Sequence, residues 1–100
     1  MKYFVKWACS GVKVEGKSAH IEDEMSRQFE HIEKSGKMKE GGAILGKGGG
    51  GYFIFEIDKP SDLLSLLGRV FWENFEIEIH PVVSYREMGE YMKTEYRKAA

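Results

Sequence analysis

The sequence has too few cysteines, too little net charge and too short apolar runs for several classes of protein. A single cysteine, Cys9, excludes an internal disulfide and the CxxC pair of a redox or zinc site. The net charge of −1, with 15 basic and 16 acidic side chains intermixed, gives little long-range attraction to nucleic acid or anionic membranes. No apolar run approaches the roughly 20 residues that a membrane-spanning helix needs. We therefore expect neither a nucleic-acid partner nor a membrane partner.

What is present is typical of one globular domain. A chain of 100 residues is long enough to bury a single core, and 42% hydrophobic with 31% charged residues is an ordinary soluble composition. Met1-Lys2-Tyr3 leads directly into strand-like sequence, without the apolar core of a secretory signal. We therefore expect a cytoplasmic protein.

Hydrophobic periodicity predicts the order strand, helix, strand, strand, helix, strand within the first 84 residues. The predicted strands are Tyr3–Trp7, Gly42–Leu45, Tyr52–Ile57 and Phe75–Val83. The first predicted helix runs from Ser18, as N-cap, to a stop at Gly36, and the second begins at Asp58–Asp62 and ends at Gly68. A further helix is predicted over Tyr85–Arg97.

This order is the signature of a split βαβ, ferredoxin-like α+β fold with an antiparallel sheet. Such a fold stacks its helices on one face of the sheet and leaves the other face to be buried by a ligand, a second copy or a nucleic acid. We predict a ferredoxin-like unit over residues 1–84 and a C-terminal helical extension over residues 85–100.

The candidate site comes from the alternation of apolar and polar residues along the predicted strand Phe75–Val83. Phe75, Ile77 and Ile79 point to one face, whereas Glu76, Glu78 and His80 point to the other. Strand one runs beside this strand in a ferredoxin-like sheet, so Lys6 joins the polar group if it lies on the same face.

We take His80 and Glu78 as candidate catalytic residues. The candidate ligand-binding residues are Lys6, Glu56, Glu76 and Tyr52. The alternative interpretation is that the face is polar because water covers it. The functional interpretation requires that the face be covered, because burial is what moves pKa values into a catalytic range.

The glycine-rich tract Gly46–Gly51 formally matches a nucleotide-binding pattern, but we interpret it as a hairpin loop. A phosphate cradle needs a helix N-terminus directly after the glycines, and Tyr52-Phe53-Ile54-Phe55 is strand sequence instead. A mobile flap over a pocket is the remaining functional alternative.

Neither the His20–Glu24 pair nor Cys9 is predicted to have a functional role. His20 and Glu24 lie one helical turn apart, a spacing that suits a metal, but no third ligand completes the set, so we predict solvated helix surface and no metal. Cys9 is predicted to be a small buried thiol rather than a reactive one, because no partner that would lower its pKa is evident.

Three segments resemble muconolactone isomerase and its relatives in the dimeric α+β barrel group: residues 51–58, Asp62-Leu63 with Leu66-Leu67, and residues 75–82. Lys37-Met38 after the first helix agrees with the same family. The resemblance implies that two chains place their sheets face to face and enclose a small-molecule pocket, with isomerase-like or monooxygenase-like chemistry as the related activities. The isomerase's catalytic groups do not map onto this chain, and a histidine stands before Pro81 where the family has a small residue.

Three functions follow in order of preference. The first is an enzyme or binding protein for a small aromatic or lactone-like molecule, with a homodimer or higher oligomer as the assembly and no cofactor, since no flavin or haem ligand pattern is present. The second is a non-catalytic dimer or assembly module without a ligand. The third is RNA binding, because RRM domains share this order of elements, although Gly50 and Ile54 replace a basic and a stacking residue of their central motif.

Overall fold

The computed structural model describes residues 1–9, 18–46 and 49–99. The elements follow the order strand, helix, strand, strand, helix, strand, helix, which confirms the predicted ferredoxin-like α+β arrangement. Their bounds are β1 Lys2–Cys9, α1 Ser18–Ser35, β2 Met38–Ala43, β3 Gly51–Glu56, α2 Asp62–Asn74, β4 Phe75–Val82 and α3 Tyr85–Ala99.

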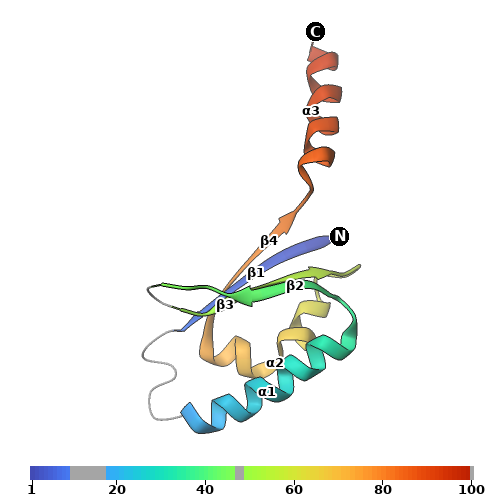
Figure 1. Cartoon of the computed structure of the whole chain (residues 1–100). Helices are drawn as coiled ribbons and strands as arrows, with labels where there is room; N and C mark the ends of the chain where they lie inside the picture. Colours follow the sequence, from blue (N-terminus) through green and yellow to red (C-terminus); the bar gives the residue numbers. More distant parts are fainter. Residues whose placement is uncertain (10–17, 47–48, 100) are drawn as a thin grey trace.

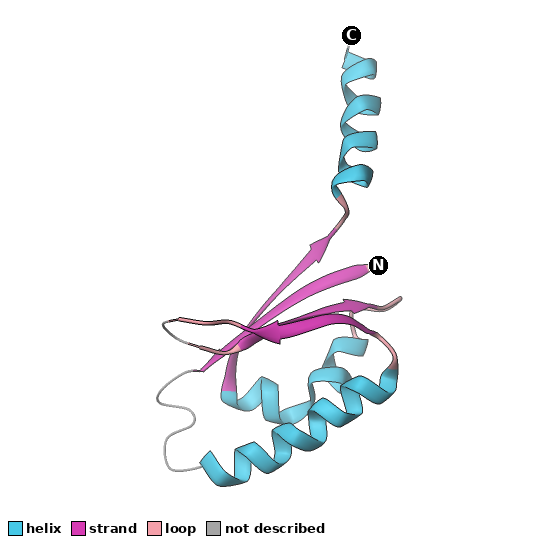
Figure 2. Cartoon of the chain, viewed as in Figure 1, coloured by secondary structure: helices cyan, strands magenta, loops and turns pink. Residues whose placement is uncertain are grey.

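The four strands form one antiparallel sheet in the order β2-β3-β1-β4. Helices α1 and α2 lie on one face of this sheet, as Figure 1 shows, and the opposite face carries neither of them. Helix α3 leaves the end of β4 and extends away from the sheet (Figures 1 and 2). The molecule therefore has a two-layer body with a projecting C-terminal helix, and it measures 60 × 30 × 20 Å along its principal axes.

The core lies between the sheet and the two covering helices. Val5 of β1 and Phe53 and Phe55 of β3 are almost fully buried, and they meet Ile32 of α1 and Phe71 of α2. Alternation along each strand sends these side chains toward the helices, because successive residues of a strand point to opposite faces. The same alternation assigns the intervening residues of β1, β3 and β4 to the open face, whereas β2 has a register shift between Met38 and Glu40.

Strand β2 begins four residues before the predicted strand, at Met38, and ends at Ala43. Its polar and glycine-rich sequence gives no hydrophobic alternation, since β2 is an edge strand that is exposed along most of its length. Ile44 instead enters the turn, where its N–H donates to the carbonyl of Gly50 at 3.1 Å, and Leu45 is exposed. The strand was therefore predicted from the wrong apolar residues.

Helix α2 does not end at Gly68, where the sequence predicted its end. Gly68 has φ +69° and ψ 173°, so the helix breaks there, but it resumes at once and continues to Asn74. Val70 and Phe71 are buried, and their packing keeps the second half of α2 on the core. Gly36, predicted to end α1, does follow its last residue and adopts φ +70°, a conformation that favours glycine.

Helix α3 begins with a side-chain cap. The Ser84 hydroxyl accepts a hydrogen bond from the Glu87 N–H at 3.0 Å, as expected of an N-cap. Tyr85, Met88, Tyr91 and Met92 of α3 are all exposed. Among the described parts of the chain, no helix has both the length and the apolar character needed to cross a membrane.

Candidate functional site on the open sheet face

The open face is built on the central strand β1. Lys6 lies opposite Tyr52 of β3 on one side and Glu78 of β4 on the other. Phe4, two residues earlier, lies between Ile54 and His80. The predicted convergence of Lys6, Glu78 and His80 on one face follows from this antiparallel register, and Tyr52 lies on the same face.

A row of three rings crosses the face. The Phe4 ring stacks against Tyr52, with ring centroids 5.8 Å apart, and against His80, with centroids 6.4 Å apart. Both pairs have an interplanar angle of 27°. Phe4 and Tyr52 are half-buried although α1 and α2 lie on the other face of the sheet (Figure 2). The rings form a platform on which a flat apolar molecule can stack.

Ionisable groups flank this platform. Nε2 of His80 lies 3.7 Å from Oε2 of Glu78, and both side chains are more than 60% exposed. Within the described residues, the Lys6 ammonium makes no ion pair. The face therefore offers a cation for an anionic group and a histidine and carboxylate side by side, all in contact with water in the single chain.

Two of the predicted ligand-binding residues lie at the ends of the face. Glu76 is opposite Ala8, one step along the face from Glu78. Glu56 is opposite Lys2 at the other end, where its Oε1 lies 3.5 Å from the N-terminal amine of Met1. These carboxylates border the ring platform rather than forming its centre.

Phe4 and Ile54 are the residues of this face that the sequence interpretation missed. The available signal was the alternation of Lys2, Phe4 and Lys6, which assigns Phe4 to the face of Lys6. Phe4 lies on the side of the sheet that α1 and α2 leave open, opposite Ile54 and His80.

Cys9 was predicted to be buried, and this prediction is wrong. Its side chain is exposed at the last position of β1, where the sheet ends opposite Phe75. His20 and Glu24 pair with each other, with Nε2 of His20 2.8 Å from Oε1 of Glu24, on the solvated surface of α1. Within the described residues no group of His, Cys, Asp and Glu has the arrangement of a metal site.

The glycine tract connects two paired strands, so the hairpin prediction is confirmed. Ala43 of β2 lies opposite Gly51 of β3, and the strand rather than a helix follows the glycines. Residues 47 and 48 are outside the described residues, and the proposed flap remains a prediction.

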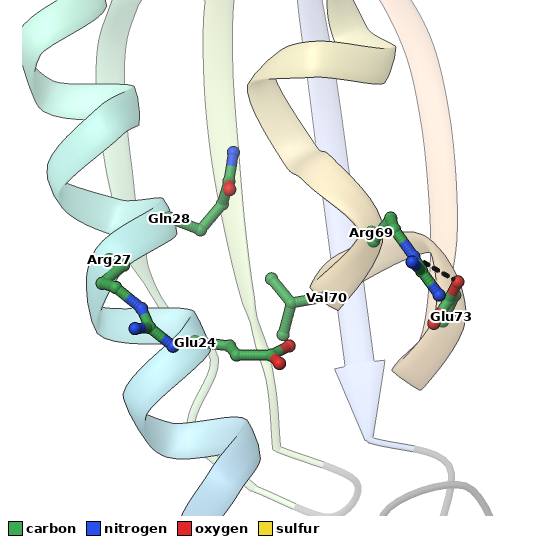
Figure 3. A pocket seen from close by; sticks show the side chains of 6 residues that line it. All are labelled: Glu24, Arg27, Gln28, Arg69, Val70 and Glu73. Carbon is green, nitrogen blue, oxygen red and sulfur yellow. Dashed lines mark hydrogen bonds and ion pairs between the residues drawn. The ribbon is translucent and has the colours of Figure 1, made fainter.

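A polar groove of about 440 Å³ lies between α1 and α2. Figure 3 shows that Gln28 extends from α1 toward α2, where its Nε2 donates to the carbonyl of Leu66 at 2.6 Å. Nε of Arg69 donates to Oε1 of Glu73 at 2.8 Å, and this hydrogen bond and charge raise the pKa of the guanidinium. Glu24, which also lines the groove, lies with its Oε1 2.8 Å from Nε2 of His20 on the same helix.

Comparison with known proteins identifies a family for the chain. The model of the family described as "Domain of unknown function (DUF3303)" matches residues 1–96, which include the sheet, α1, α2 and most of α3. No curated protein matches the chain.

Proposed function

Because the chain belongs to the DUF3303 family, whose description assigns no activity, we propose a function from the open sheet face: two copies enclose a small aromatic or lactone-like molecule between their sheets. In this cytoplasmic homodimer, the rings of Phe4 and Tyr52 hold the ligand and Lys6 binds its anionic group. His80 and Glu78 act as the acid and base pair if the ligand is transformed.

The ring row is the observation that carries this proposal. An aromatic platform beside an unpaired ammonium is the combination that a flat, anionic or ester-like molecule needs. The resemblance of residues 51–58 and 75–82 to muconolactone isomerase supports the same ligand class. The lactone isomerisation itself is not part of the proposal, since that enzyme's catalytic groups have no match here.

Apolar surface left uncovered by the chain supports the homodimer. Phe4, Tyr52 and Ile54 lie on the open face. An exposed apolar stripe on α3 consists of Tyr85, Met88, Tyr91 and Met92. A second copy that covers the sheet face removes its apolar area from water, which favours association. The same step takes His80 and Glu78 out of water and places them beside an enclosed ligand, within reach for proton transfer.

The test of the ligand site compares two histidines. A library of small aromatic acids and lactones is screened by thermal shift and calorimetry on the wild-type chain, His80→Ala and His31→Ala. His31 is exposed on α1 and provides the matched control. We expect a ligand whose affinity falls about tenfold or more in His80→Ala and stays unchanged in His31→Ala, which corresponds to about 1.4 kcal/mol or more. Equal affinities in all three proteins would remove His80 from the site.

A non-catalytic assembly module is the second candidate, and the exposed stripe of α3 favours it. In that case the dimer forms, but its polar groups pair across the interface and no ligand-sized cavity remains. A crystal structure of the dimer distinguishes the two functions: a cavity lined by Phe4, Tyr52 and His80 supports the ligand site, and a closed interface supports the assembly module.

A further inference from the structure

A second hollow lies on the opposite, helix-covered side of the sheet, beneath the edge strand β2. This β2 groove has a volume of about 400 Å³, and its larger lining side chains are those of Trp7, Phe29, Glu33, Met38 and Phe53. The remaining lining residues are glycines and an alanine of β2 and its loop. The size is within the range of small-molecule sites, roughly 300–1,000 Å³.

The groove exists because β2 presents small residues to α1. A Cβ built on Gly41 would lie 3.0 Å from the sulfur of Met38 and 3.4 Å from Cδ1 of Phe53. The position therefore points into the space between these side chains, and a larger residue at position 41 would occupy it. Glycine at this position leaves the edge of the core open.

The aromatic cluster of the core is accessible at this opening. Trp7, Phe29 and Met38 are only partly buried, whereas their neighbours Phe53 and Phe71 are almost fully buried. The ring of Phe29 lies 6.2 Å from that of Trp7 and 5.7 Å from that of Phe53, and both pairs are tilted. The partly buried rings therefore form the apolar wall of the groove.

The charge at the groove is negative. Glu33 is the charged residue among the described lining residues, and within the described chain its carboxylate makes no ion pair. It lies in the last turn of α1, where the free carbonyl groups add negative partial charge. Lys34, the neighbouring cation, is already paired with Glu30 at 2.8 Å.

We propose that the β2 groove binds a small organic cation, namely an amine carried on an aromatic or branched apolar body. The ammonium group lies at Glu33 and the body packs against Trp7, Phe29 and Met38. A carboxylate attracts the charge directly, and aromatic rings attract it through their negative faces. This site goes beyond the function proposed above, since it uses the other side of the sheet and is present in a single chain.

Three probes that share a phenylethyl body and carry a cationic, a neutral and an anionic head group test the ligand class: 2-phenylethylammonium, 2-phenylethanol and 3-phenylpropionate. Each is titrated into isotopically labelled full-length protein, and the signals of the Trp7 indole N–H and the β2 amides are followed by NMR. We expect the ammonium probe to shift these signals and to bind roughly fivefold tighter than the alcohol, with the propionate weakest. Equal affinities for the three probes, or no shift with the ammonium probe, would overturn the proposal.

Two matched pairs of variants locate the site. Glu33→Gln should lower the affinity for the ammonium probe roughly fivefold and leave the affinity for the alcohol unchanged. Glu22→Gln, at an exposed position of the same helix, should change neither affinity. Gly41→Val should abolish binding by filling the groove, whereas Glu40→Val places the same side chain on the other face of β2 and should preserve it.

Unchanged ammonium affinity in Glu33→Gln contradicts the proposal even if Gly41→Val fails to fold, because Glu33 is exposed. Loss of ammonium binding in His80→Ala would place the probe on the open face instead and would also contradict it. Unchanged ammonium binding in His80→Ala supports the β2 groove. The function proposed for the open face is tested separately, by the screen of aromatic acids and lactones.

Discussion

Gly51 lies directly against the indole ring of Trp7. A Cβ built on Gly51 would come within 2.8 Å of Cζ2 and 2.9 Å of Cε2 of that ring, and within 2.6 Å of the Gly42 carbonyl oxygen. The ring has little room to move away, because it also meets Phe71 and Phe75 edge to face, at centroid distances of 5.3 and 5.2 Å. A side chain at position 51 is therefore incompatible with the packing of the sheet on its core.

We expect Gly51→Ala to lower the free energy of unfolding by about 1–3 kcal/mol, the usual cost of overpacking a core. Urea denaturation followed by Trp fluorescence measures it. Gly89→Ala on α3 is the control, because within the described residues no atom beyond its neighbours and the local backbone of α3 lies within 4 Å of its Cβ position. The free energy of unfolding should change by less than about 0.5 kcal/mol. A stability loss that is the same in both variants would contradict the close packing of Gly51 on Trp7.

At the break in α2, substitutions of Gly68 and Gln28 should have non-additive effects on the free energy of unfolding. A Cβ at Gly68 would lie 2.6 Å from Oε1 of Gln28, and its φ of +69° is strained for any other residue. We expect Gly68→Ala to cost about 1–3 kcal/mol, and to cost less in a Gln28→Ala background, where the steric contact is removed. A double-mutant cycle by urea denaturation measures the difference. Strict additivity would mean that the backbone conformation alone accounts for the loss.

If the open face is the dimer interface, a charge at its centre should weaken self-association. Phe4→Glu should weaken self-association about tenfold or more, because it buries a carboxylate in the proposed interface. Sedimentation equilibrium at micromolar concentration measures the association. Leu64→Glu makes the same kind of change on the exposed surface of α2 and should leave association unaltered. Wild-type protein that is monomeric throughout would remove the basis of the dimer.

The exposed apolar stripe on α3 predicts that the protection of this helix from amide hydrogen exchange depends on protein concentration. An isolated helix of about 15 residues is only marginally stable in water, so α3 needs a partner to remain helical. We expect amide hydrogen exchange in residues 85–95 to slow as the concentration rises, and Tyr91→Glu to abolish this slowing. Lys93→Glu, a charge change at another exposed position of α3, is the control. Fast exchange at every concentration in the wild-type chain would show that α3 has no partner in solution.

Elements that bury a periodic set of side chains were predictable from the sequence. The alternation from Phe75 to Ile79 separated the two faces of β4, and α1 was predictable because its apolar residues Ile21, Met25, Phe29 and Ile32 recur at helical spacing. Strand β2 was misplaced because an edge strand buries too little to carry a hydrophobic period. The second half of α2 was missed because Gly68 suggests an end, and only the burial of Val70 and Phe71 shows why the helix resumes.

The sequence by itself determined the order of elements and the polar character of the β4 face, since local periodicity reflects which side chains must leave water. Only the tertiary structure decided that Phe4 stacks between Tyr52 and His80, and that Lys6 lies opposite Glu78. It also decided that small residues in β2 leave a groove beside Glu33. Such relationships depend on strand register and on the packing of distant segments, and a local pattern in the chain contains neither.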